Sequence, residues 1–153
     1  MKALIYKGKH DIVFDEVPKP EILYATDALV RVLNTTICGT DTGIYKGKNP
    51  EVAAGRVLGH EGIGIIEAIG DNVTNFKVGD KVLISCVTVC GSCSYCKKQL
   101  HAHCKDGGWI LGYQIDGVQA EYVRIPHANN SLYKIPEGIA DDVAVLLSDI
   151  LPT

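Results

Sequence analysis

Four cysteines lie close together in the sequence: Cys90, Cys93, Cys96 and Cys104. A Cys-x-x-Cys turn can direct two thiolates at one centre, and here two such turns share their middle thiol. The fourth thiol returns to complete a tetrahedron, which leaves no open position on a zinc ion. The spacing therefore predicts a structural zinc site, which stabilises the fold and performs no chemistry itself.

A disulfide framework is the main alternative, because the chain contains six cysteines, an even number. However, the first residues contain too short an apolar run for a signal peptide, and no segment reads as a membrane span. We therefore expect a reducing, cytoplasmic location in which thiols stay free. An iron–sulfur site fits the spacing less well. His101 and His103 could each replace a thiolate, but with four cysteines present we expect both on the surface.

A second set of candidate ligands is dispersed along the chain. His60 and Glu61 are neighbours flanked by glycines, and Cys38 and Asp149 lie far from them in the sequence. Each has a common structural explanation when taken alone, as a hydrogen-bonded histidine, a small buried thiol or a partnered carboxylate. Together they supply a thiolate, an imidazole and a carboxylate, the ligand set of a zinc ion with an open fourth position. Glu61 could be a fourth ligand or could support a ligand.

Length and composition indicate one domain with a substantial core, since the chain has 153 residues, of which 46% are hydrophobic. The net charge is -3 and the main basic cluster is the pair Lys97 and Lys98, which argues against a nucleic-acid surface. The last residues, 143–153, form an apolar run that ought to be buried. We therefore expect the chain to be a fragment whose packing partner lies outside it.

Short β-prone runs separated by glycine-rich turns dominate the rest of the chain. The expected strands are 2–6, 12–16, 29–36, 62–69, 81–85, 120–125 and 132–135, with a helix over 140–147. One strand leads into the loop 37–41, which contains Cys38, and another begins just after Glu61. The stretch 86–112 carries few strand formers, as expected for a loop folded by metal. This pattern, with sixteen glycines, predicts a mainly β barrel or sandwich.

Several short motifs carry a family resemblance. The segment Gly59-His60-Glu61 is followed at fixed intervals by Gly64, Gly70 and Val73, and the turn Gly79-Asp80-Lys81-Val82 comes after them. Together with the four-cysteine spacing, these motifs resemble the zinc-containing alcohol dehydrogenases of the medium-chain dehydrogenase/reductase family. The resemblance covers the whole chain.

The resemblance implies a second zinc site, with a catalytic role. Cys38, His60 and Asp149 would ligate this zinc with Glu61 beside it, so that the chain would hold two zinc ions. Asp149 departs from many relatives, which have a cysteine there, and is similar to some bacterial secondary-alcohol dehydrogenases.

Further residues receive roles from the same resemblance. Thr40 takes the place of the hydroxyl that relays the substrate proton, and Asp41 that of the carboxylate that orients the histidine ligand. Gly43 stands where some relatives have a relay histidine. Cys86 and Trp109 fall at substrate-pocket positions, where the small Cys86 would leave room for a secondary alcohol or ketone. The alternative is that Trp109 is a core residue and Cys86 merely ends a strand.

The fold that the resemblance implies is a GroES-like, partly open β-barrel with short helices and a structural-zinc lobe. Residues 1–153 would be the N-terminal part of the catalytic domain. The Rossmann domain would be absent, in agreement with the lack of a G-x-G-x-x-G motif after a strand. The full-length protein would oxidise a small-molecule alcohol with NAD or NADP as a homo-oligomer, either dimer or tetramer, whereas this chain alone would be inactive. The alternatives are a polyol or sugar-alcohol dehydrogenase and a non-catalytic zinc-binding module.

Overall fold

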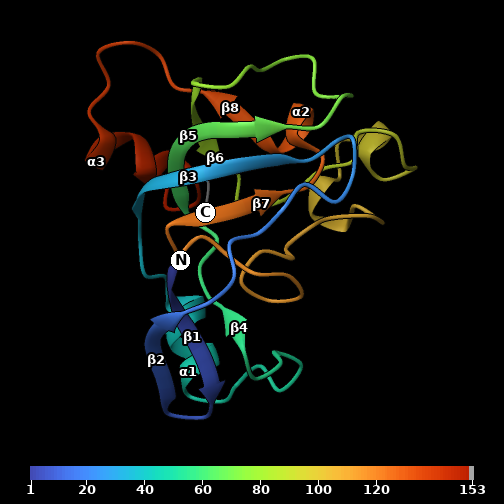
Figure 1. The fold of residues 1–153 in the computed structure, drawn as a ribbon. Coiled ribbons are helices and arrows are strands. Elements are labelled where there is room, and N and C mark those ends of the chain that lie inside the picture. Colours follow the sequence, from blue (N-terminus) through green and yellow to red (C-terminus); the bar gives the residue numbers. More distant parts are fainter. Residues whose placement is uncertain (152–153) are drawn as a thin grey trace.

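Two antiparallel sheets form the framework of the computed structural model, which describes residues 1–151. The smaller sheet contains, in spatial order, β2 (Asp11–Glu16), β1 (Lys2–Gly8) and β4 (Arg56–Val57). The larger sheet contains, in spatial order, β7 (Tyr122–Ile125), β3 (Ala28–Thr35), β5 (Gly62–Ile69), β6 (Lys81–Ile84) and β8 (Leu132–Lys134). Figure 1 shows the larger sheet above the smaller one. The predicted mainly β, partly open fold is confirmed, since the described sheets do not close into a barrel.

The strands expected from the sequence are all present, with ends within two residues of those expected, and only β4 was not predicted. The larger sheet packs its apolar face into the main core, where Val30, Val82 and Ile84 are each 0% exposed. Complete burial of such side chains contributes about 1.5–3 kcal/mol each relative to exposure. A smaller cluster around Ala3 and Ile5 lies under β1 and β4. The core therefore holds the strand ends, from which the candidate ligands extend, in fixed positions.

The pairing of β3 with β5 decides where distant residues meet. The two strands are antiparallel and pair from Ala28 with Ile69 to Thr35 with Gly62. The residues that follow Thr35 therefore lie beside the residues that precede Gly62. Gly64 permits this close pairing, because a Cβ at that position would lie 2.4 Å from the carbonyl oxygen of Arg31.

A short helix, α1 (Gly39–Tyr45), begins inside the segment 37–41, where a loop was predicted, so that prediction was right for residues 37–38 and wrong for residues 39–41. Its two glycines are poor helix formers. However, the carboxylate of Asp41 accepts a hydrogen bond from the backbone N–H of Cys38 at 2.9 Å and so caps the helix. Ile44 anchors the same helix in the core with 1% of its surface exposed. Capping and burial thus outweigh the weak intrinsic propensity.

The helix expected over 140–147 is present as α3 (Asp141–Ala144) followed by the 3-10 turn η3 (Val145–Leu147), whereas α2 (Ala128–Ser131) was not predicted. The stretch 86–112 contains the 3-10 turns η1 (Cys96–Lys98) and η2 (His101–His103) and no strand, as expected. None of the helices within residues 1–151 is long and apolar enough to cross a bilayer.

The apolar run 143–153 is only partly buried. Ala144 and Val145 pack against Ile63 in a small core cluster. The exposed members, with exposed fractions of 54, 38, 39, 52 and 69%, are Val143, Leu146, Leu147, Ile150 and Leu151. Pro152 and Thr153, which complete the run, lie outside the described residues.

Candidate metal centres

The four clustered thiols converge on one point in the lobe 86–112. The Sγ atoms of Cys90 and Cys96 lie 3.8 Å apart, and those of Cys93 and Cys96 lie 3.4 Å apart. Together with Cys104, the four sulfurs all lie within 4.8 Å of one another. A tetrahedral zinc ion with Zn–S bonds of about 2.3 Å places its sulfurs about 3.8 Å apart. The geometry therefore fits a four-thiolate zinc, and the six cysteines of the chain are all free thiols.

Backbone N–H groups of the lobe point at the sulfurs. The N–H of Cys90 donates to Sγ of Cys104 at 3.3 Å, and that of Cys96 donates to Sγ of Cys93 at 3.5 Å. Hydrogen bonds from the backbone N–H groups of Lys105 and Cys96 lower the pKa of Cys93 to about 6. The lobe thus stabilises the thiolate of Cys93, which is the form that binds zinc, whereas burial raises the pKa of Cys96 to about 12.

His101 and His103 are both exposed, as predicted, and lie in η2 on the outside of the lobe. The lobe is also attached to the main body, because the N–H of Val89 donates to the buried hydroxyl of Ser131 at 3.0 Å. The sulfur cluster is therefore built within the lobe and held against α2.

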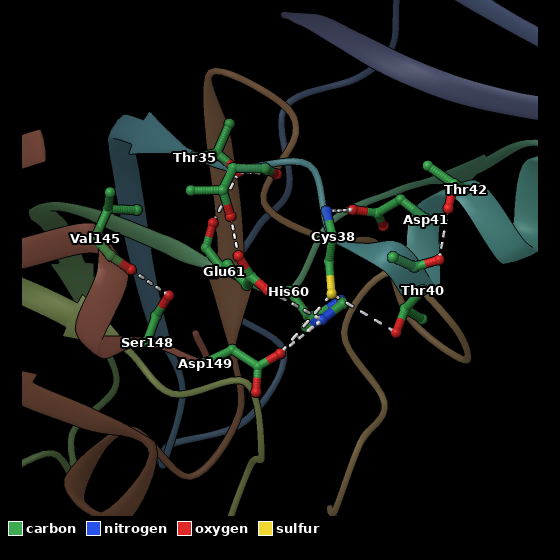
Figure 2. A network of polar contacts seen from close by, with 12 residues as sticks. Thr35, Cys38, Thr40, Asp41, Thr42, His60, Glu61, Val145, Ser148 and Asp149 are labelled. Carbon is green, nitrogen blue, oxygen red and sulfur yellow. Dashed lines mark hydrogen bonds and ion pairs between the residues drawn. The ribbon is translucent and has the colours of Figure 1, made fainter. Parts of the chain in front are cut away.

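The second set of candidate ligands comes together from three separate segments. Cys38 is the residue before α1, His60 and Glu61 immediately precede β5, and Asp149 follows η3. Figure 2 shows the side chains of Cys38, His60 and Asp149 pointing toward one another. One donor atom from each of these residues, with one carboxylate oxygen of Glu61, lies within 4.8 Å of all the others. The structure therefore unites the four residues that sequence analysis named for this site.

The distances between the donor atoms suit a tetrahedral cation. Nε2 of His60 lies 3.5 Å from Oδ2 of Asp149 and 3.8 Å from Oε1 of Glu61. Sγ of Cys38 lies 4.0 Å from Oδ2 of Asp149. Zinc bonds of about 2.0–2.3 Å predict donor separations of about 3.3–3.8 Å, so these three distances agree with a bound zinc ion to within a few tenths of an ångström. A thiolate, an imidazole and carboxylates are also the ligand types that zinc prefers.

A cavity of about 210 Å³ opens beside these ligands. It is lined by Thr40, His60, Cys86, Val87, Trp109 and Asp149. Both predicted pocket residues, Cys86 and Trp109, therefore lie on its wall, and so does Thr40, whose Oγ1 is 3.8 Å from Sγ of Cys38. Hence one small space adjoins two of the candidate ligands, a hydroxyl group and an aromatic ring.

The aromatic wall of the cavity is held by stacking. The ring of Trp109 stacks on that of Tyr113 with centroids 4.8 Å apart, and it lies nearly perpendicular to the His60 ring with centroids 6.0 Å apart. Burial, and then the neighbouring Asp149, raises the pKa of the Cys86 thiol to about 12. Cys86 is therefore a neutral, uncharged part of the wall at neutral pH.

A model of the family described as "Alcohol dehydrogenase GroES-like domain" matches residues 24–137, which is more than half of the chain. The chain belongs to this family. The GroES-like fold expected from the resemblance is thereby confirmed, together with membership of the zinc-containing branch of the medium-chain dehydrogenase/reductases.

Three relatives illustrate the similarity. A zinc-type alcohol dehydrogenase-like protein of Schizosaccharomyces pombe is 36% identical, over 100% of this chain and 41% of that protein. The solved structure of zinc-dependent alcohol dehydrogenase 2 from Streptococcus pneumonia in its apo form is 55% identical, with a TM-score of 0.92, over 96% of this chain and 42% of that one. RspB from Escherichia coli CFT073, solved with the cofactor NADH, is 34% identical, with a TM-score of 0.82, over 96% of this chain and 42% of that one. The chain thus spans 41 to 42% of the length of these proteins.

Sequence analysis missed two polar residues of this GroES-like domain, one that contacts a candidate ligand of the second centre and one that supports the surrounding residues. The hydroxyl of Thr36 donates to Oε2 of Glu61. The side-chain amide of Gln119, which is 6% exposed, donates to the carbonyl oxygen of Thr36 at 3.2 Å and to Oδ2 of Asp41 at 3.0 Å. Neither residue belongs to a motif, and a polar residue at a strand end is too common to indicate such a contact by itself.

The contacts of Asp41 differ from those expected. The family resemblance implied that its carboxylate orients His60, but Oδ2 instead accepts hydrogen bonds from the backbone N–H of Cys38 and from Gln119. Oδ1 is buried and has no hydrogen-bond partner among residues 1–151. In this structure Asp41 therefore supports the backbone at Cys38, while one of its oxygens remains able to accept a further hydrogen bond.

Proposed function

We propose that this chain is the N-terminal part of the catalytic domain of a zinc-dependent alcohol dehydrogenase that uses NAD or NADP. The observation that carries the proposal is the convergence of Cys38, His60 and Asp149 beside a cavity, in a chain of the GroES-like alcohol dehydrogenase family. Three ligands with an open position next to a substrate-sized space are typical of a catalytic zinc, whereas four thiolates are typical of a structural one. We assign these two roles to the two centres.

The residues around the cavity would have different roles in such a reaction. Zinc, when bound by Cys38, His60 and Asp149, would supply a Lewis acid that polarises the oxygen of an alcohol or carbonyl substrate. Thr40 lies on the cavity wall next to Cys38, where its hydroxyl can accept the proton of a substrate alcohol and pass it outward. Gly43 stands where some relatives have a relay histidine, so a histidine relay has no counterpart at that position.

The shape of the cavity bears on the substrate. Its volume of about 210 Å³ suits a small molecule, and the thiol of Cys86 occupies much less space than an aromatic ring would. The rigid face of Trp109, stacked on Tyr113, provides an apolar surface for the carbon chain of the substrate. These features favour a small secondary alcohol or the corresponding ketone.

The hydride acceptor has to be held by another part of the protein. The relative RspB was solved with NADH, and this chain matches 42% of that structure. We infer that the dinucleotide is bound by a Rossmann domain in the portion of the relatives that this chain does not span. By itself the chain is then predicted to show no turnover.

Zinc content tests the assignment of the two centres. Elemental analysis of the purified protein should find two zinc ions per chain. Cys93→Ser should remove the zinc of the four-thiol lobe alone, and His60→Ala should remove the zinc of the second centre alone. A content of one zinc that is unaffected by His60→Ala would contradict the catalytic assignment and support a structural zinc module.

A further inference from the structure

The carboxylate of Glu61 has two oxygens that face different partners. Glu61 is 1% exposed, so its charge depends on contacts within the protein. Oε1 lies 3.8 Å from Nε2 of His60 and belongs to the cluster of donor atoms described above. Oε2 accepts the hydrogen bond from the hydroxyl of Thr36. One oxygen is thus directed at the candidate metal centre and the other is held away from it.

Thr36 is itself fixed at three points. Its N–H donates to the carbonyl oxygen of Glu61 at 3.3 Å, just beyond the last residue pair of β3 and β5. Its carbonyl oxygen accepts a hydrogen bond from Gln119 at 3.2 Å. Its hydroxyl donates to the Glu61 carboxylate. The two backbone contacts hold the Cα of Thr36 in place, so the hydroxyl can reach only those carboxylate positions that lie within the range of its own side-chain rotation.

We propose that Thr36 is a positioning residue of the Cys38–His60–Asp149 centre. Its hydroxyl holds Oε2 of Glu61, so that Oε1 alone faces the other three donors. A carboxylate can contact a cation through one oxygen or through two. The bond from Thr36 opposes the two-oxygen arrangement, because turning Oε2 inward would leave a hydroxyl without its partner. Glu61 is thereby restricted to a single-oxygen contact, which takes up one position on the ion where a two-oxygen contact would take up two. This inference rests on the proposed function.

The neighbouring Thr35 provides a matched control. Its hydroxyl also donates to Glu61, but to the backbone carbonyl oxygen, at 2.8 Å. The two threonines are adjacent, carry the same side chain and contact the same residue. They differ in whether the hydroxyl reaches the carboxylate. A comparison of their valine variants therefore separates an effect on the position of the carboxylate from an effect on the backbone where β3 ends.

The test measures zinc affinity at the second centre by competition with a chromophoric chelator, with the four-thiol site already filled. Thr36→Val should weaken this affinity about tenfold, as is usual when a group that orients a metal ligand is lost. Thr36→Ser restores a hydroxyl and should restore the affinity, and Thr35→Val should leave it unchanged. In a Glu61→Ala background, Thr36→Val should have no further effect on the affinity, since the carboxylate that Thr36 holds is already absent.

Each contrary result has a definite meaning. Equal affinities of wild-type protein and Thr36→Val would overturn the positioning role while leaving the proposed function in place. An equal loss in Thr35→Val would assign the effect to the strand end and would also overturn it. A wild-type protein that binds zinc only in the four-thiol lobe would overturn the proposed function and this inference with it.

Discussion

The side-chain amide of Gln119 donates a hydrogen bond to Oδ2 of Asp41 at 3.0 Å, across 78 residues of sequence. The same oxygen accepts a hydrogen bond from the backbone N–H of Cys38, so Gln119 helps to hold the segment that contains Cys38 by way of Asp41. Gly59, the residue before His60, packs on Gln119 so closely that a Cβ there would lie 2.6 Å from Cγ of the glutamine. Gln119 therefore connects the segment of one candidate ligand to the segment of another.

Replacing Gln119 should destabilise the fold. Gln119→Leu removes one of the two donors to Oδ2 of Asp41, whose other oxygen is buried and has no hydrogen-bond partner in the described part of the chain. The loss should lower the free energy of unfolding by about 1–3 kcal/mol. Urea denaturation would measure the change. The exposed Gln114→Leu serves as the control and should alter stability by less than about 0.5 kcal/mol. Equal stabilities of the two variants would show that the bond between Gln119 and Asp41 contributes nothing.

Removal of metal should unfold the four-thiol lobe and leave the sheets intact. The lobe has no strand, and its main backbone link is the bridge between Thr88 and Gly108. A loop of this kind depends on its ligands for order, because metal binding supplies its folding free energy. After treatment with a strong chelator, hydrogen exchange should therefore become fast at Thr88 and Gly108.

The amides of β5 provide the internal reference for this experiment. They lie in the centre of the larger sheet, paired on both sides, and should keep their protection after chelation. Unchanged protection in the lobe would mean that packing against α2, through the Val89 to Ser131 bond, is sufficient to order it.

The two centres differ in how far sequence alone can predict them. The thiols of the lobe are separated by few residues, so their spacing alone predicted a common metal. Cys38, His60 and Asp149 are brought together by the register of β3 and β5 and by the position of η3, which no local pattern specifies. Their residue types suggested a ligand set, and the family resemblance supplied the reason to expect them at one site.

Tertiary contacts also explain what sequence analysis missed. The helix α1 forms on a glycine-containing segment because Ile44 is buried and Asp41 caps it, and both facts depend on the fold. The contact between Gln119 and Thr36 spans 83 residues and arises only after the sheets have formed. Strand existence could be predicted from local alternation and turn residues, whereas the hydrogen bonds that support the candidate ligands could not.

Filling the cavity at Cys86 should change substrate preference in an active, longer form of the protein. Cys86→Phe places an aromatic ring in a space of about 210 Å³ beside Trp109. The ring then occupies the volume that the second carbon substituent of a secondary alcohol needs. The ratio of kcat/KM for a secondary over a primary alcohol of equal carbon count should fall about tenfold or more, the size usual for one carbon group in a packed pocket. Steady-state kinetics with both alcohols gives this ratio.

Cys86→Ser is the control for this substitution, because it keeps the side chain small and should leave the ratio nearly unchanged. An unaltered ratio in Cys86→Phe would place the substrate elsewhere in the site. A preference of the wild-type enzyme for the primary alcohol would contradict the argument from cavity shape.

Arg124→Ala should be among the most destabilising single changes to the fold. Nη1 of Arg124 lies 3.0 Å from Oδ2 of Asp27, whose side chain is 0% exposed and which links the start of β3 to β7. Without the guanidinium, the donors left to the buried Asp27 carboxylate among residues 1–151 are the backbone N–H groups of Tyr24 and Leu23, at 3.1 and 3.3 Å. Loss of one partner of a buried ion pair costs about 3–5 kcal/mol, which urea denaturation would detect as a large fall in the midpoint.

The exposed pair of Lys2 and Glu16 is the matched comparison. Its atoms are 3.1 Å apart, almost the same separation as in the buried pair, but the side chains are 48% and 72% exposed. Lys2→Ala should therefore cost less than about 1 kcal/mol, because water and salt already screen that attraction. If Arg124→Ala and Lys2→Ala shifted the midpoint equally, burial would not be what makes the pair of Arg124 and Asp27 important, and the hydrogen bonds from Tyr24 and Leu23 would be enough to hold the carboxylate.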